Sequence, residues 1–478
     1  MARIGLLYVR GSLPCYENFG YLPTDLVREP RDLDRVDMLI IPPGNIVETR
    51  AVSQELAEAI IRFAEDGGLV LGICSGLHLL SREVDTGIRR IRCLGLIDAV
   101  FRRLIALDWA EIEIVESTWL TRGLVGRKLR GLHIHTYGYP EGDARCFMRS
   151  VLPRHNYFYG PITIASGFVG RKDSVLGMLP HLLLDLYPEL RENILRELGV
   201  SDERPILERN KELRRILSAE IGVDTGIRIA EEKPLDRCKR VIAVVSGESG
   251  EGKTFIATGI VGTLRRLGYR VSIAKLGSDL RDVHPALYLL KTSISPFMGI
   301  AIAGRRGIYG WTGWREAIRE LLGDSDILVI EGVMGLLTGY SRRCGCEYPC
   351  STLEFLECSR IPTILVVSCS RGGIEDAVER AKLYVSIMRR RGVDVLCIAL
   401  NEFYGDEQEL EYVKKNLSVL GVEVYTVPKT CLGSASIPEV DLDIHTYAIT
   451  AMEIVSRSIP VEHVINSAPC IDLELYSS

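Results

Sequence analysis

The feature that most constrains the fold of this 478-residue chain is the glycine-rich segment Gly247-Glu-Ser-Gly250-Glu-Gly252-Lys253-Thr254. It matches the pattern G-x4-G-K-T in full, follows an apolar run at 241–245 and opens a helical pattern at 255–267. Backbone N–H groups of such a loop surround a phosphate, while the lysine neutralises charge and the threonine hydroxyl can ligate Mg²⁺. The segment predicts a P-loop for ATP; the alternative is a strand-to-helix turn without a nucleotide.

Apolar runs typical of buried strands alternate with helical patterns in both halves of the chain. This alternation predicts an α/β fold with two doubly wound parallel-sheet domains. Between the halves lies a stretch dense in charge, in which we see no buried strand. We therefore predict one domain at 1–200, a charged linker at 201–237 and a second domain at 238–478.

Charge and hydropathy exclude some classes of partner. The formal net charge is −5 and the sequence pI is near 6.0, which gives no general attraction for nucleic acid. No segment reaches the ~18 apolar residues of a membrane span, and the apolar stretch within Met1 to Arg10 is too short for the core of a secretory signal. We expect a cytoplasmic protein that binds neither nucleic acid nor membrane.

The first half contains an apolar strand, 69–73, that breaks into the pattern G-x-C-x-G around Cys74. Glycines on both sides allow a tight strand-to-helix turn, and a thiol at the start of a helix gains thiolate character. The pattern therefore predicts a nucleophile elbow. A buried core cysteine beside two glycines is the alternative.

Acidic residues follow two strands of the second half. The apolar run 326–330 leads directly into Glu331, and the run 271–274 ends in Lys275-Leu-Gly-Ser-Asp279-Leu-Arg-Asp282. Carboxyl ends of parallel strands line the ligand crevice of such sheets, so we expect Glu331 at a metal site. Two carboxylates so close together are costly without a metal or ligand.

These segments, together with the P-loop and Glu331-Gly-Val-Met-Gly335, resemble the dethiobiotin-synthetase-type ATPase domain of cobyrinate a,c-diamide synthases. The resemblance implies that Asp279 and Asp282 lie near Mg²⁺ and the carboxylate to be activated, with Asp279 in the metal site beside Thr254 and Glu331. It implies that Lys275 stabilises phosphoryl charge. Asn401 falls where such domains recognise adenine, although an asparagine after a strand can also cap a turn.

The first half resembles class I glutamine amidotransferases, which have a flavodoxin-like fold. The turn after 37–42 then places Gly44 and Asn45, with Ser75, as backbone donors of an oxyanion hole. The segment Asp173-Ser-Val-Leu-Gly-Met-Leu-Pro-His181 resembles the strand that delivers the catalytic base. Against His181 stand His133 and His135, which share one strand face. Leu183 occupies the place of the usual third residue, a glutamate; the cobyrinate synthases also lack it, so we expect a Cys74–His181 dyad.

Together these resemblances imply that glutamine supplies ammonia and that ATP activates a carboxylate of a cobyrinate-type corrinoid. The order of the domains is reversed relative to the family, and Ile437-Pro438-Glu439 lacks the residues that commonly follow there. Amidation of another polycarboxylate, such as a nickel-sirohydrochlorin or a cell-wall precursor, therefore stays open. So do a MinD-like nucleotide switch or metal-insertion ATPase with a non-catalytic amidotransferase module, and a homodimer.

Most cysteines sit singly in apolar runs, and there we interpret Cys93, Cys358, Cys369 and Cys397 as small buried hydrophobes. The exception is a tight group in Cys344-Gly-Cys346-Glu-Tyr-Pro-Cys350. It could hold a metal or form a disulfide, and no fourth ligand is evident from the sequence.

Overall fold

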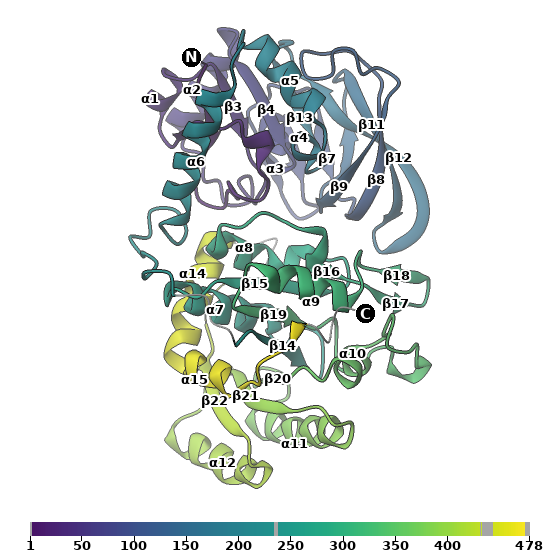
Figure 1. Cartoon of the computed structure of the whole chain (residues 1–478), viewed down its shortest axis with the longest axis vertical. Coiled ribbons are helices and arrows are strands. Elements are labelled where there is room, and N and C mark those ends of the chain that lie inside the picture. The colour runs from purple at the N-terminus through teal and green to yellow at the C-terminus, as the bar shows by residue number, and fades with distance from the viewer. Residues whose placement is uncertain (1, 234–237, 431, 433–442, 474–478) are drawn as a thin grey trace. The chain divides into compact units, whose positions relative to one another are not determined.

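The computed structural model describes residues 2–233, 238–430, 432 and 443–473, and these form two compact units (Figure 1). The first unit comprises the chain up to Gly226 with the short segments 291–294 and 443–445, and the second comprises the remainder. Each unit is built on a sheet that contains parallel strands, so the α/β prediction is confirmed.

The sheet of the first unit contains nine strands among the described residues. In spatial order they are β2 (Asp25–Val27), β1 (Ile4–Leu7), β3 (Met38–Ile41), β4 (Leu69–Ile73), β13 (Val175–Met178), β12 (Phe158–Val169), β11 (Cys146–His155), β8 (Ala106–Ile114) and β9 (Lys128–His135). Pairing is parallel from β2 to β13 and antiparallel from β13 to β9. The antiparallel half departs from the predicted parallel sheet. Buried and exposed residues alternate along β8 and β11, as expected for strands with one solvated face.

A smaller sheet and six helices complete this unit in the described part of the chain. The sheet has the order β10 (Tyr139–Glu141), β7 (Val100–Arg102), β5 (Glu83–Asp85) and β6 (Arg90–Arg92). The helices are α1 (Pro30–Leu33), α2 (Gln54–Glu65), α3 (Ser75–Leu80), α4 (Leu183–Leu186), α5 (Pro188–Glu197) and α6 (Arg204–Ser218).

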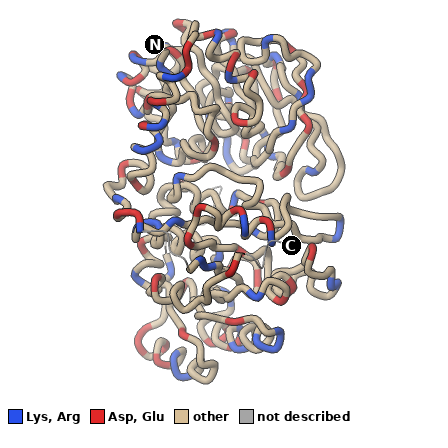
Figure 2. The backbone as a smooth tube through the Cα atoms, viewed as in Figure 1, with Lys and Arg blue, Asp and Glu red and all other residues tan. Residues whose placement is uncertain are grey.

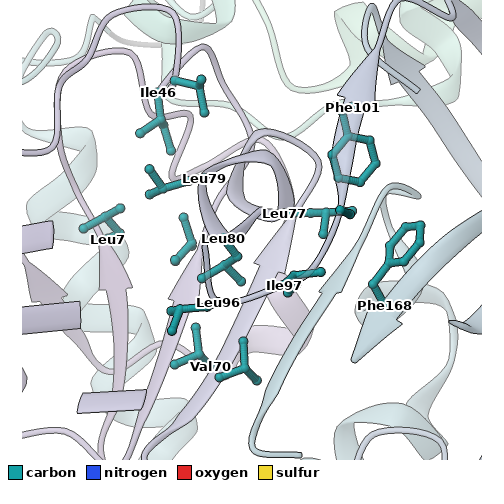
Figure 3. Packing of buried hydrophobic residues seen from close by; sticks show 14 of the residues in the cluster. Leu7, Ile46, Val70, Leu77, Leu79, Leu80, Leu96, Ile97, Phe101 and Phe168 are labelled. Atoms are coloured by element: carbon teal, nitrogen blue, oxygen red, sulfur yellow. The ribbon is translucent and has the colours of Figure 1, made fainter. Parts of the chain in front are cut away.

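The helix that follows Cys74 is anchored in the apolar core (Figure 3). Leu77 and Leu80 of α3 are fully buried and lie in one cluster with Val70, Phe101 and Phe168. The rings of Phe101 and Phe168 meet edge to face at 5.6 Å between centroids. Burial of each large apolar side chain contributes about 1.5–3 kcal/mol, so the start of α3 is held firmly in place.

The segment predicted as a linker contains α6. Ile206, Leu213 and Leu217 of this helix are buried, and Asn210 Nδ2 donates to Pro23 O at 2.7 Å. The high charge of the segment thus belongs to the exposed face of an amphipathic helix, whose apolar face packs within the first unit. Residues 234–237 lie outside the described residues.

The sheet of the second unit contains seven strands, all parallel, within the described ranges. In spatial order they are β16 (Gly299–Ile300), β15 (Val271–Leu276), β19 (Ile327–Glu331), β14 (Arg240–Ser246), β20 (Thr363–Ser368), β21 (Val395–Phe403) and β22 (Glu423–Pro428). A hairpin, β17 (Ile302–Gly304) and β18 (Gly307–Tyr309), lies apart from this sheet. The central strands are apolar along nearly their whole length because both faces of the sheet are covered.

The helices of this unit are α7 (Lys253–Arg266), α8 (His284–Leu290), α9 (Trp314–Gly323), α10 (Thr352–Ser359), α11 (Ile374–Arg390), α12 (Glu407–Leu417), α14 (Ile444–Ser458) and α15 (Val461–Ser467). The short 3-10 helices of the chain are η1 (Phe19–Tyr21), η2 (Leu280–Val283), η3 (Pro296–Met298), η4 (Tyr340–Arg342) and η5 (Ser418–Leu420). None of the described helices is both long and apolar enough to cross a membrane. Basic and acidic residues are interspersed over both units (Figure 2).

Two disulfides link described cysteines, Cys238 to Cys470 and Cys346 to Cys358. The interpretation of Cys358 as an isolated buried hydrophobe is therefore wrong. Cys358 lies on α10, close in space to the cysteine-rich loop before that helix. Of the two uses foreseen for this loop, the disulfide is present at Cys346, whereas Cys344 and Cys350 are free thiols.

Candidate functional site

Cys74 occupies the sharp turn between β4 and α3 that its sequence pattern predicts. Its backbone has φ 51° and ψ −106°, a conformation that is strained for a residue with a side chain. A Cβ on Gly72 would lie 2.6 Å from Gly76, and one on Gly76 would lie 2.2 Å from Ile41 O. Only glycines fit on the two sides of this turn, which holds the thiol at the carboxyl end of the sheet.

His181 follows β13 and is held from two directions. Its backbone N–H donates to Leu132 O at 2.8 Å, and Nδ1 is 2.7 Å from Glu17 Oε1. Glu17 Oε2 in turn accepts the Leu182 N–H at 2.8 Å. Within the described residues, His181 Nε2 is buried and has no hydrogen-bond partner other than the neighbouring Cys74 thiol. That nitrogen is thus free to exchange a proton with the thiol.

The charges around His181 favour its protonated form. Burial alone lowers the pKa of His181, but the neighbouring Cys74 thiolate and the Glu17 carboxylate raise it, to about 10. Tyr16 packs edge to face on the imidazole at 5.1 Å between centroids. Cys74 and His181 are therefore placed to share one proton in a dry environment, as a nucleophile and its base require.

Glu17 is the residue that the sequence analysis missed. We predicted a Cys74–His181 dyad because Leu183 takes the place of the usual glutamate, and the structure supplies a carboxylate from near the other end of the domain instead. Glu17 is wholly buried, and it is the only charged residue in the sequence between Arg10 and Asp25. A lone carboxylate in an uncharged stretch was the available signal, because buried charges need a partner.

Two of the three predicted oxyanion donors have a free N–H. Among the described residues the backbone N–H groups of Gly44 and Ser75 have no acceptor, whereas the Asn45 N–H donates to Gly11 O at 3.0 Å. Gly44 has φ 139°, and a Cβ there would lie 2.1 Å from Gly11 O. The N–H groups of Gly44 and Ser75 therefore remain available as donors, whereas the Asn45 N–H is already engaged.

His133 and His135 lie on either side of the residue whose carbonyl approaches the thiol, since Cys74 Sγ is 3.7 Å from Ile134 O. The two imidazoles bond to each other at 3.0 Å, and His133 also contacts Ser150 Oγ at 3.0 Å. Burial lowers the pKa of His133 to about 3 and holds that of His135 well below its ordinary value. Both histidines are neutral, in contrast to His181, whose pKa is raised.

In the second unit the P-loop connects β14 to α7. Lys253 Nζ donates to Ser246 Oγ and to Met334 O, both at 2.8 Å, and Thr254 Oγ1 donates to Glu331 Oε1 at 2.8 Å. Burial lowers the pKa of Lys253 to about 8, and nearby Lys275 acts in the same direction. The loop, the adjacent strand β19 and its acidic end thus form one polar cluster.

Lys275 lies between two acidic side chains. Its Nζ is 2.5 Å from Asp282 Oδ2 and 2.8 Å from Glu331 Oε1. Burial alone lowers the pKa of Lys275, but these carboxylates raise it above its ordinary value. The other oxygen of Glu331, Oε2, is buried and lacks a hydrogen-bond partner within the described ranges.

Asp279 and Asn401 have partners within the second unit, and their predicted roles stay predictions. Asp279 pairs with Arg281 at 2.7 Å, so Asp282 is the carboxylate of that loop that joins Glu331. Asn401 Nδ2 donates to Glu251 O of the P-loop at 3.0 Å. In this structure Asn401 supports the phosphate loop itself. The segment 437–439 lies outside the described residues.

Comparisons with known proteins match both units. The family model described as a CobB/CobQ-like glutamine amidotransferase domain matches residues 16–185, and the model described as a CobQ/CobB/MinD/ParA nucleotide binding domain matches residues 242–438. The first match includes Cys74 and His181, and the second includes the P-loop.

Among curated relatives, the pyridoxal 5'-phosphate synthase subunit PdxT of Listeria welshimeri is 35% identical over 104 residues, covering 20% of this chain and 53% of that protein. The cobyrinate a,c-diamide synthase of Saccharolobus solfataricus is 26% identical over 249 residues, covering 50% of this chain and 52% of that protein. The chain thus spans about half the length of these relatives. The MinC:MinD cell division protein complex of Aquifex aeolicus aligns at 15% identity and a TM-score of 0.30, covering 49% of this chain and 98% of that one.

The fold, the thiol elbow and the P-loop define a glutamine amidotransferase domain joined to a nucleotide-binding domain. The chain carries the CobB/CobQ-like glutamine amidotransferase domain first and the CobQ/CobB/MinD/ParA nucleotide binding domain second, and half of it is similar to a cobyrinate a,c-diamide synthase.

Proposed function

We propose that this chain is an ATP-dependent amide ligase that takes its nitrogen from glutamine. The observation that carries the proposal is the Cys74–His181–Glu17 arrangement in a chain that also contains the Lys253, Thr254 and Glu331 cluster. A thiol with a buried base releases ammonia, and a P-loop with an acidic neighbour handles nucleotide phosphates. Together they supply the two reactants of an amide synthesis.

In the glutaminase half, Cys74 Sγ attacks the side-chain amide carbon of glutamine. His181 Nε2 takes the thiol proton and returns it to the departing nitrogen, so ammonia leaves and a glutamyl thioester remains. Water then hydrolyses the thioester to glutamate and restores the thiol. The free N–H groups of Gly44 and Ser75 are suited to stabilise the oxyanion that forms at each step.

In the ATPase half, a substrate carboxylate oxygen attacks the γ-phosphorus, giving an acyl phosphate and ADP. Lys253 and Lys275 stabilise the charge of the transferring phosphoryl group. The site fits Mg²⁺, because Thr254 and Glu331 offer oxygen ligands and Glu331 Oε2 is buried without a partner among the described residues. When bound, the ion would neutralise phosphate charge. Ammonia then attacks the acyl carbon, phosphate leaves and an amide remains.

For the substrate we propose the carboxylates of a corrinoid or a related tetrapyrrole. The support is the similarity to cobyrinate a,c-diamide synthases, which extends over half of this chain. The a and c acetate groups of a cobyrinate-type ring are the first expectation. Nickel-sirohydrochlorin and cell-wall precursors carry equivalent carboxylates.

The test is to incubate the full chain with ATP, Mg²⁺, glutamine and each of these polycarboxylates, and to follow the products by mass spectrometry. We expect one of them to lose the small mass difference between a carboxyl and an amide, with matching amounts of ADP and glutamate. Absence of glutamine hydrolysis in every mixture would overturn the proposal and favour a MinD-like nucleotide switch. Hydrolysis without any amide would keep the glutaminase and reject these substrates.

A further inference from the structure

The loop before α10 and the first turns of that helix bring together three ligand atoms that the proposed reaction does not use. Cys344, Cys350 and Glu354 each offer one such atom, and the three atoms lie within 4.8 Å of one another. Cys350 Sγ lies 3.1 Å from Glu354 Oε2. The sequence had indicated the two cysteines but not the carboxylate, which lies one helical turn beyond Cys350.

The cluster is held rigidly from both sides. The backbone N–H groups of Cys344, Gly345 and Cys350 donate to the Glu354 carboxylate at 3.2, 2.9 and 2.8 Å. The Cys346–Cys358 disulfide ties the loop that carries both thiols to the helix that carries the carboxylate. Little further ordering is needed for these atoms to bind an ion, which favours affinity.

The cluster lies at the boundary between the interior and solvent. Glu354 and Cys350 are buried and Cys344 is exposed. The carboxylate and the two sulfur atoms thus converge on one point, which an ion can reach from the exposed side of Cys344.

We propose that Cys344, Cys350 and Glu354 bind a divalent ion of the zinc class, with water as a fourth ligand on the exposed side of Cys344. Two S–H bonds break, two metal–sulfur bonds form and two protons go to solvent. Thiolates select zinc over the hard ions Mg²⁺ and Ca²⁺, and tetrahedral coordination needs one ligand beyond the three present.

The proposed site is connected to the loop that follows Glu331. Thr352, the first residue of α10, donates to Val333 O at 2.9 Å and accepts from Val333 N at 3.2 Å. An ion that fixes the start of α10 would therefore also steady the segment beside the nucleotide cluster. Its role is structural, since no described reacting group lies in the cluster.

Titration of the full chain with Co²⁺, an optical probe of the zinc class, tests this. We expect stoichiometric binding with thiolate-to-cobalt charge-transfer absorption, and displacement of the probe by Zn²⁺. Cys344→Ser and Glu354→Gln should each weaken binding at least tenfold. Cys146→Ser and Cys93→Ser, which remove free thiols elsewhere, are the matched controls and should bind as the wild type does.

Three results would overturn the proposal: no cobalt retained after dialysis, unchanged binding by Cys344→Ser, or a Cys344–Cys350 disulfide in peptides mapped without reduction. Because Cys344 is exposed, its serine variant should fold even if a change at buried Glu354 does not. Glutamine and ATP turnover are not part of this readout, so the result is independent of the proposed ligase activity.

Discussion

Glu17 and His181 lie 164 positions apart in the chain, yet Glu17 Oε1 and His181 Nδ1 are joined by a hydrogen bond of 2.7 Å. Because a carboxylate can only accept, Nδ1 carries the proton of that bond, which leaves Nε2 for the thiol. The second oxygen of Glu17 is held by the Leu182 N–H. The glutamate therefore fixes the orientation of the imidazole and leaves Nε2 for the proposed proton transfer with Cys74.

Replacing Glu17 by glutamine should lower glutamine hydrolysis by about 10²- to 10⁴-fold, because the amide no longer holds the imidazole in one tautomer or stabilises its protonated form. Ammonia-dependent activity should persist. The pKa of His181, followed by NMR, should fall relative to the wild type. Glu192→Gln changes an exposed glutamate of the same unit and serves as the control; a Glu17→Gln variant with wild-type turnover would refute the role.

Cys74→Ala should abolish glutamine-dependent amidation while added ammonium salts still support it, because only the nitrogen source is lost. The variant should also fail to form a covalent adduct with a glutamine analogue, measured by intact mass. Cys93→Ala, which removes another free thiol of the same unit, is the control and should keep wild-type turnover. Full glutamine-dependent turnover in Cys74→Ala would refute the mechanism.

Glu331→Gln should reduce ATP hydrolysis by about 10²- to 10³-fold and raise the Mg²⁺ concentration needed for half-maximal rate. The variant keeps the shape of the side chain but removes the charge that faces Thr254 and Lys275. Glu316→Gln, an exposed change on α9, should leave both quantities unaltered. An unchanged Mg²⁺ requirement would exclude Glu331 from the metal site.

Asp185 gives a pH dependence of stability with a definite sign. Burial, with a contribution from Glu17, raises its pKa from 3.8 to about 6. The folded state then binds more protons than the unfolded state between these values, so this group makes the free energy of unfolding fall as pH rises through that window.

Asp185→Asn should therefore cost more stability at pH 4 than at pH 7, by on the order of 1–3 kcal/mol, measured by urea unfolding. The comparison between the two pH values removes the constant loss of an acceptor for the Asn18 and Gly20 N–H groups. Asp66→Asn, at an exposed helix end, should show no such difference. An equal cost at both pH values would contradict the raised pKa.

The disulfide between Cys238 and Cys470 closes a loop with a sequence separation of 232. A double change of both cysteines to serine should destabilise the second unit by up to about 5 kcal/mol, chiefly by freeing the unfolded chain. Thermal unfolding under non-reducing conditions measures this. Dithiothreitol should shift the wild type toward the variant, and Cys146→Ser should leave the transition in place.

The sequence was sufficient for the parts of the fold in which neighbours along the chain decide the structure. The P-loop and the elbow at Cys74 are local turns whose glycines admit one backbone path, and both lie between the predicted strand and helix. The antiparallel strands β8 to β12 were not foreseen, because their partners are set by packing across the sheet. The helix α6 was missed since its charged face dominates the composition of that segment.

The sites followed the same division. Thr254 and Glu331 meet because parallel strands end at one edge, a relationship that chain order implies. Glu17 could not be assigned to His181, because its segment has no pattern that names a distant partner. The contacts of Cys358 with Cys346 and of Glu354 with Cys350 could not be predicted for a similar reason. Glu354 and Cys358 have a spacing that suits a helix, and only the three-dimensional path of the preceding loop brings Cys346 and Cys350 next to α10.

The position of Lys275 between Asp282 and Glu331 affects the order in which Mg²⁺ and the nucleotide bind to the second unit. With an ammonium group already neutralising both carboxylates, a bare Mg²⁺ entering alone would have to compete with a counter-ion built into the chain. An incoming triphosphate brings its own negative charge and gives that ammonium another partner. Mg²⁺ should consequently arrive with the nucleotide, so that the Lys275–Asp282–Glu331 contacts keep their arrangement before either binds.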